Sequence, residues 1–213
     1  MPAVPTSPTS PASSARPVID MWFDPTCPWT WMTSRWVTEV AERRDVDLRW
    51  HVMSLAVLNE DPADDDGTPD HHADSWPLTR VLVAAARDHG DDVLAPLYTA
   101  IGTRKHLGGR ADVDGIVAEA LAEVGLPAEL AEAAGSDAVD DLVRASHAEA
   151  MASVGDDAGS PVVAVDGVGY FGPVVSPAPT GRAALDLFDA LTLLARVPGF
   201  AELKRARTSG PQL

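Results

Sequence analysis

The chain has 213 residues, of which 46% are hydrophobic, and its formal net charge is −16 at pH 7. This length fits one compact domain, or a core with a sizeable insertion, and the apolar content is sufficient for a hydrophobic core. The excess of acidic residues argues against nucleic acid and against anionic membrane surfaces as partners, and no apolar run approaches the length of a membrane span.

The single cysteine excludes an internal disulfide and fits a reducing compartment, so we predict a cytoplasmic protein. Residues 1–16 are rich in Pro, Ser, Thr and Ala and are predicted to form a disordered tail without the features of a secretory signal. The first folded unit is predicted as a strand over 18–23, a helix over 28–44 and a parallel strand over 47–53, which together make a right-handed crossover unit.

Cys27 lies in the segment 23–30, where the first predicted strand turns into the first predicted helix. Free backbone N–H groups and the positive end of the helix dipole meet at such a position, so we expect an exposed, reactive thiol with a lowered pKa. Pro28 suits the first position of a helix. Thr30 stands where a redox protein of this layout usually carries a second cysteine; its hydroxyl can donate a hydrogen bond to the sulfur but cannot form a disulfide. The alternative is a buried cysteine that only packs.

The middle of the chain changes from strand patterns to helix patterns. Residues 59–74 are dominated by Asp, Pro, Gly and His and are predicted to form a solvated loop or lid. This loop holds a group of candidate metal ligands, but because it is flexible we predict no structured metal site. The group consists of Asp70, His71, His72 and Asp74. Apolar periodicity predicts helices over 77–89, 92–106, 112–126 and 127–134, and a longer helix that begins near Asp137, a favourable N-cap.

Strand character returns only near the C-terminus. Residues 161–165 form the first predicted strand there, and Asp166-Gly167 predicts a type I′ hairpin turn into a return strand over 168–171. Thr180 is predicted to cap a last helix over 181–196, which Pro198 stops. The basic segment 198–213 is predicted to be a loose tail.

The predicted order is β-α-β, a block of helices, then β-β-α, which indicates an α/β protein with a thioredoxin-like fold and an inserted all-helical domain. The predicted core comprises residues 17–56 and 157–197, and the lid loop and helical insertion comprise 57–156. No dinucleotide fingerprint or phosphate-binding loop is present, so we predict neither a flavin nor a nucleotide cofactor. In this fold Pro161 would follow a cis peptide bond and face the cysteine turn, with the Ser160 backbone free to pair with a thiol ligand. A proline that merely begins a strand is the alternative.

Several short motifs are similar to those of the DsbA-like thioredoxin superfamily. They are segments 27–30, 159–161, 166–167 and 171–173. Segments 22–29, 51–55 and 202–205 resemble the actinobacterial mycothiol-dependent nitroreductase subgroup more closely. The resemblance implies a cytosolic oxidoreductase that uses mycothiol as co-substrate, acts on a small aromatic or disulfide substrate, and is compatible with a homodimer. Thr30 departs from the subgroup pattern, so a single thiol would react and an external thiol would resolve the mixed disulfide.

The candidate site residues follow from the motif and from this resemblance. The predicted catalytic residues are Cys27, Thr30 and Pro161, and the predicted ligand-binding residues are Trp22, Trp29, Ser160, His51 and Asn59. Trp22 and Trp29 would form a flat wall for an aromatic substrate. His51 is either a base that holds the thiolate or a hydrogen-bonded strand histidine, and Asn59 would touch the ligand by resemblance.

Two other functions remain open at this point. One is a thiol-cofactor-dependent isomerase or transferase of the kappa-class type, in which the reacting sulfur belongs to the cofactor. The loop 172–176 lacks the charged clamp of the glutathione-dependent relatives, which favours mycothiol over glutathione. The other is a non-catalytic binding or chaperone-like module that lost its redox activity together with the second cysteine.

Overall fold

The computed structural model describes residues 16–60, 75–155 and 157–213. Most of the predicted N-terminal tail and of the predicted lid, including its four candidate metal ligands, lies outside these residues. The elements in chain order are β1 (Val18–Phe23), α1 (Pro28–Arg43), β2 (Asp47–Val52), α2 (Leu55–Leu58), α3 (Ser75–His89), the 3-10 helix η2 (Asp91–Val93), α4 (Leu94–Gly102), the π-helix η3 (Thr103–Leu107), α5 (Val113–Val124), the 3-10 helix η4 (Ala128–Gly135), α6 (Asp140–Val154), β3 (Val162–Val165), β4 (Val168–Phe171) and α7 (Gly181–Ala195).

One four-stranded sheet with the strand order β2-β1-β3-β4 organises the fold. β1 and β2 are parallel, while β3 pairs antiparallel with both β1 and β4. The β3–β4 turn has positive φ at both central residues, 49° at Asp166 and 82° at Gly167, as a type I′ turn requires. The predicted crossover unit, hairpin and thioredoxin-like order are therefore confirmed.

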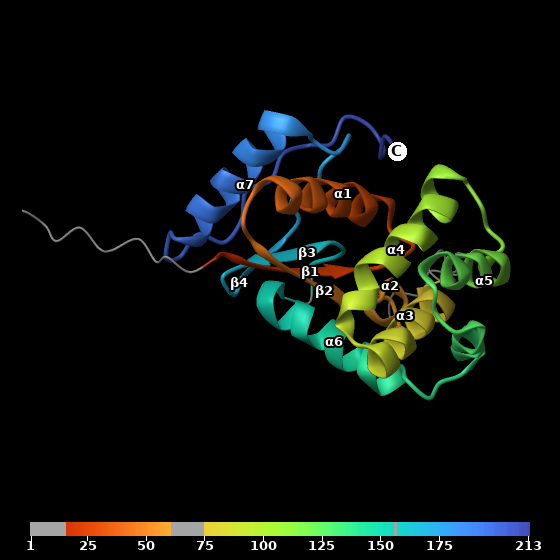
Figure 1. The fold of residues 1–213 in the computed structure, drawn as a ribbon. Coiled ribbons are helices and arrows are strands. Elements are labelled where there is room, and N and C mark those ends of the chain that lie inside the picture. The colour runs from red at the N-terminus through yellow and green to blue at the C-terminus, as the bar shows by residue number, and fades with distance from the viewer. Residues whose placement is uncertain (1–15, 61–74, 156) are drawn as a thin grey trace, which may run out of the picture.

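The two faces of the sheet have different coverings because side chains alternate along each strand. Met21 and Phe23 belong to the large core cluster that also contains residues of α1 and α7, while Trp22 belongs to a second cluster with Ala150 and Met151 of α6. Figure 1 shows α1 and α7 on one side of the sheet and α6 on the other. The helix α6 therefore packs against the sheet, although the sequence analysis placed its residues in the helical insertion.

The remaining helices, α3, α4 and α5, gather beside the sheet (Figure 1) and continue the same core. Trp31 of α1 joins the two parts: its ring lies so close to Gly102, at the end of α4, that a Cβ at this glycine would overlap it. Tyr98 of α4 lies against Phe23 of β1, with ring centroids 4.1 Å apart. The N-terminal end of α1 is thus fixed between the sheet and the helical part.

Local signals misplaced several element ends. The predicted helix over 92–106 is divided into η2, α4 and η3, and α2 was not predicted. Asp137 does not cap α6, which begins at Asp140 and is preceded by a turn in which the Asp140 N–H donates to the Asp137 carbonyl. Thr180 precedes α7 but makes no side-chain cap; the carboxylate of Glu39 on α1 accepts from the Gly181 N–H instead, at 2.8 Å. The start of α7 is thus supported by a partner that is distant in the sequence, whereas the turn before α6 is local.

The C-terminal segment 198–213, predicted to be a loose tail, contains neither helix nor strand and is mostly exposed, but it contacts the rest of the fold at some of its residues. The Phe200 ring lies 5.9 Å from the Tyr170 ring, and the Gln212 N–H donates to Ser176 Oγ at 2.7 Å. The segment runs on the same side of the sheet as α1 and α7 (Figure 1), which the predicted chain order could not reveal.

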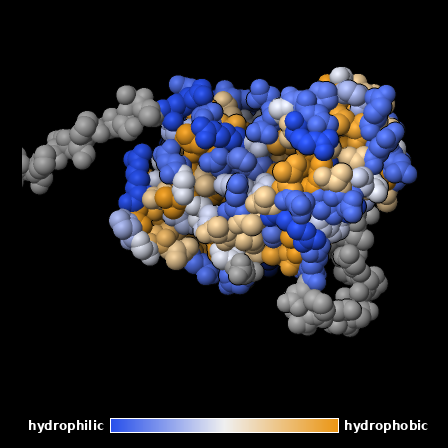
Figure 2. Space-filling view, turned by 90° about the horizontal axis from the view of Figure 1, so that it is seen from below, coloured by the Kyte–Doolittle hydropathy of each residue, from blue (hydrophilic) through white to orange (hydrophobic). Residues whose placement is uncertain are grey.

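The surface follows the composition of the chain. Figure 2, seen from the side of α6, shows hydrophilic residues across the face with hydrophobic patches between them. Within the described part of the chain, the helices are all too short or too polar to cross a membrane.

Candidate active site

Cys27 occupies the turn between β1 and α1, as predicted. β1 ends at Phe23, the Cys27 N–H donates to the Asp24 carbonyl at 3.3 Å, and α1 begins at Pro28. Cys27 is the N-cap residue, with φ −78° and ψ 115°, and its carbonyl accepts the first helical hydrogen bond from Trp31. Extended backbone at the N-cap followed by proline is a common way to begin a helix.

The thiol itself is buried, with only 6% of Cys27 exposed, and its Sγ donates to the Ser160 carbonyl at 3.7 Å. Burial raises the pKa of Cys27 above its ordinary value, and the negative charge of Asp24 raises it further. Hydrogen bonds from the Thr30 side chain and backbone lower the pKa, but less than burial raises it. The prediction of an exposed thiol with a lowered pKa is therefore wrong: the helix N-terminus favours the thiolate as expected, but the cost of desolvation exceeds this effect.

The segment before β3 closes the site from the other side. The peptide bond between Ser160 and Pro161 is cis, as predicted. The Ser160 hydroxyl lies 2.5 Å from the Thr30 hydroxyl and accepts from the Asp24 N–H at 3.4 Å. Thr30 is completely buried. Ser160 therefore contacts the thiol with its carbonyl and the cysteine turn with its hydroxyl, although the two segments are 130 residues apart.

Trp22 and His51 form a pair on the face of the sheet that α6 covers. They are neighbours in the β1–β2 register, and their rings stack with centroids 4.7 Å apart. His51 Nε2 lies 2.9 Å from Asp20 Oδ1. Its observed partners are thus a carboxylate and an indole of the same sheet face, which corresponds to the hydrogen-bonded strand histidine of the two predicted options.

Trp29 and Asn59 are the two remaining predicted ligand contacts, and they have different surroundings. Trp29, in the first turn of α1, is half-buried, and the Arg207 guanidinium lies 5.0 Å from its ring. Asn59 is exposed at the end of α2, where its Nδ2 donates to the Leu55 carbonyl at 2.6 Å. Contact of either side chain with a ligand remains a prediction.

The structure adds two residues that the sequence did not single out. His106 of η3 reaches the cysteine turn, where its Nε2 lies 3.1 Å from the Pro25 carbonyl. Because a carbonyl can only accept, Nε2 carries the proton, and burial lowers the pKa of His106 to about 4. The second is Asp24, whose carboxylate accepts from the Thr26 N–H at 2.7 Å. The sequence offered one signal for Asp24. Aspartate in a turn commonly accepts from the backbone N–H two residues later.

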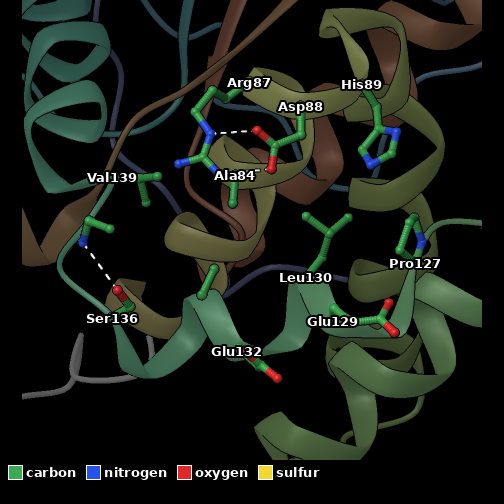
Figure 3. A pocket seen from close by; sticks show the side chains of 12 residues that line it. Ala84, Arg87, Asp88, His89, Pro127, Glu129, Leu130, Glu132, Ser136 and Val139 are labelled. Atoms are coloured by element: carbon green, nitrogen blue, oxygen red, sulfur yellow. Dashed lines mark hydrogen bonds and ion pairs between the residues drawn. The ribbon is translucent and has the colours of Figure 1, made fainter.

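A surface cavity elsewhere does not belong to this site. It measures about 490 Å³ and lies between α3 and η4, with Leu130 as part of its wall and the Arg87–Asp88 ion pair at its rim (Figure 3). None of its lining residues belongs to the cysteine turn or to the Ser160 segment. Among residues 16–60, 75–155 and 157–213, no group of three or more His, Cys, Asp or Glu side chains is arranged to hold a metal ion.

Comparison with known proteins assigns the chain to a family. The model of the Rv2466c-like family, described as mycothiol-dependent nitroreductase Rv2466c, matches residues 26–205. The chain belongs to this family. The uncharacterized protein Rv2286c of Mycobacterium tuberculosis is 32% identical over 192 residues, which are 89% of this chain and 82% of that relative.

Solved structures agree on the fold. The DsbA-type protein SCO1869 from Streptomyces coelicolor is 22% identical with a TM-score of 0.58, and the match covers 92% of this chain and 97% of that one. The cytosolic disulfide reductase DsbM from Pseudomonas aeruginosa, solved with GSH, is 23% identical with a TM-score of 0.55, covering 82% and 99%. The predicted DsbA-like thioredoxin fold is confirmed, and membership of the Rv2466c-like family identifies this member as a thiol oxidoreductase.

Proposed function

We propose that this protein is a monothiol oxidoreductase that uses mycothiol as its co-substrate, with Cys27 as the reacting group. The contact that carries the proposal is the approach of the Cys27 thiol to the Ser160 carbonyl, directly before the cis bond to Pro161. Segments from the two ends of the fold thereby meet at the only sulfur nucleophile of the chain. The match to a mycothiol-dependent family supports the identity of the thiol.

The proposed cycle needs no second cysteine. The Cys27 sulfur, once deprotonated, attacks one sulfur of a disulfide substrate; the S–S bond breaks, and the departing thiolate takes up a proton. The mixed disulfide on Cys27 is then attacked by the thiolate of mycothiol, which forms a new disulfide with the bound group and releases Cys27. Electrons therefore pass from thiol to disulfide through one protein sulfur. A cytoplasmic location is part of the proposal, because thiols are kept reduced there.

Thr30 has two roles in this proposal. Its hydrogen bonds to the sulfur favour the thiolate and oppose the effect of burial on the Cys27 pKa. Its hydroxyl also holds Ser160 in place at 2.5 Å. We propose that a ligand enters between the cysteine turn and the Ser160–Pro161 segment and replaces the thiol as the partner of the Ser160 carbonyl. Trp29 is half-buried and lies two residues after Cys27 in the sequence. We propose it as the contact for an aromatic substrate.

Intact-mass analysis tests this function. After incubation with oxidised mycothiol, the wild-type chain should gain the mass of one mycothiol, Cys27→Ser should gain none, and added mycothiol should remove the adduct. Oxidised glutathione is the comparison and should react more slowly. An unmodified wild-type protein after prolonged incubation would contradict the proposal.

One observation favours a second candidate, a thiol-cofactor-dependent isomerase or transferase. A buried thiol whose pKa is raised is a poor nucleophile at rest, so the reacting sulfur could be the cofactor's own. Cys27→Ser separates the two functions, because it abolishes the redox cycle but leaves a transferase or isomerase largely active.

A further inference from the structure

Asp24 carries a completely buried carboxylate three positions before Cys27. Each of its oxygens accepts one backbone N–H and one hydroxyl. Oδ1 accepts from the Thr26 N–H at 2.7 Å and from Thr26 Oγ1 at 2.6 Å, and Oδ2 accepts from the Leu55 N–H at 2.7 Å and from Ser75 Oγ at 2.5 Å. Four donors fill the acceptor capacity of a deprotonated carboxylate.

These donors come from three separate segments of the chain. Thr26 lies in the cysteine turn, Leu55 is the first residue of α2, and Ser75 is the first residue of α3. Ser75 Oγ also lies 2.9 Å from Ser54 Oγ, the side chain that caps α2. One buried group thus links the cysteine turn to the point where the chain leaves the sheet and to the point where the helical part begins.

We propose that Asp24 is a positioning residue for Cys27, which fixes the cysteine turn against α2 and α3 and places a negative charge beside the thiol. The proposal rests on the proposed function only in taking Cys27 as the reacting group. It goes beyond that function because it assigns a role to a side chain outside the Cys27–Thr30–Ser160 contacts.

The charge has a direct consequence for the thiol. Repulsion from Asp24 is one cause of the raised Cys27 pKa, after the larger effect of burial. The other titratable groups that sense this charge are Tyr98 of α4, His106 of η3 and His147 of α6. Burial lowers the pKa of both histidines and raises that of Tyr98, so it favours the neutral form of all three groups.

Asparagine cannot replace this carboxylate. An amide has one oxygen and one NH₂ group, and in either orientation its NH₂ group faces one of the two fixed backbone N–H groups, that of Thr26 or that of Leu55. The hydroxyls of Thr26 and Ser75 can rotate, but the backbone donors cannot. Asp24→Asn therefore removes the charge and also leaves one buried N–H without its acceptor.

The pH dependence of Cys27 alkylation by iodoacetamide separates the charge effect from simple loosening of the turn. In Asp24→Asn the midpoint of the alkylation rate should shift to lower pH, because the repelling charge is gone. In Ser75→Ala it should shift to higher pH, because the charge remains and has lost a donor that compensates it. Loosening alone would expose the thiol and shift both midpoints downward. Asp140→Asn, which removes a carboxylate of α6 that pairs with Arg80, is the matched control and should leave the midpoint unchanged.

A folded Asp24→Asn protein with an unchanged or higher midpoint would overturn the proposal, and so would a Ser75→Ala midpoint that is lowered together with that of Asp24→Asn. If Asp24→Asn yields no folded protein, Ser75→Ala decides, and a midpoint equal to or below that of the wild type overturns the proposal. Alkylation reads the thiol directly, so the result stands whether or not the wild type forms an adduct with mycothiol. Failure of the proposed function and failure of the Asp24 role are therefore distinguished.

Discussion

Replacement of Thr30 by valine removes one hydroxyl while keeping the shape of the side chain. Thr30 is completely buried, and its Oγ1 lies 2.5 Å from Ser160 Oγ, which keeps the Asp24 N–H as a second partner at 3.4 Å. A buried neutral hydrogen bond contributes about 0.5–1.5 kcal/mol, so Thr30→Val should lower the free energy of unfolding by about 1 kcal/mol. For a chain of this size such a loss lowers Tm by about 2–4 °C.

The same substitution acts on the thiol. Because the Thr30 hydroxyl lowers the Cys27 pKa, its removal should raise that pKa further and slow alkylation of Cys27 at pH 7. Thr33→Val is the matched control: Thr33 is also buried on α1, but its hydroxyl donates to the Pro173 carbonyl at 2.7 Å. We expect Thr33→Val to lose comparable stability without a change in the pH midpoint of alkylation. A Thr30→Val midpoint at or below the wild-type value would refute this account of the site.

Two further predictions concern the helices around the site. Gly102→Ala places a methyl group into the ring of Trp31 and should lower the free energy of unfolding, measured by urea denaturation, by about 1–3 kcal/mol. The control is Gly135→Ala, whose new methyl group meets no atom within 4 Å and should change stability little. Equal losses in the two variants would contradict the close contact between Gly102 and Trp31. His106 has a pKa of about 4, below the ordinary 6.5, so on acidification the unfolded chain takes up this proton before the folded chain does. The free energy of unfolding should therefore fall by up to about 3 kcal/mol as the pH is lowered from about 6.5 to 4. His106→Gln should reduce this slope without removing it, because burial also lowers the pKa of His147, and an unchanged slope would exclude a contribution from His106.

Family membership separates this enzyme from the non-catalytic alternative. Its one cysteine is buried, so the groups around the thiol set how readily it ionises. Burial and the charge of Asp24 raise the Cys27 pKa, while hydrogen bonds to Thr30 and to the Trp29 backbone lower it. A ligand that opens the site to water would reduce the first effect and leave the hydrogen bonds in place. Such an enzyme would hold its thiol protonated at rest and form the thiolate in the presence of its ligand.

The sequence by itself determined those features that depend on neighbouring residues. Pro28 after Cys27 marks the start of α1, Asp166-Gly167 supplies the two positive φ angles of the hairpin, and the order of strand and helix patterns gives the thioredoxin-like fold. Each of these is a local preference of the backbone, or a sum of such preferences, and can be read along the chain.

Only the tertiary structure decided the state of the thiol and the partners of Asp24. Ser160 covers Cys27 from 133 residues away, and Leu55 and Ser75 reach Asp24 from 31 and 51 residues away. Desolvation depends on every atom that excludes water from a group, whichever part of the chain supplies it. The local helix-terminus signal at Cys27 therefore gave the correct position for the sulfur but the wrong direction for the shift in its pKa.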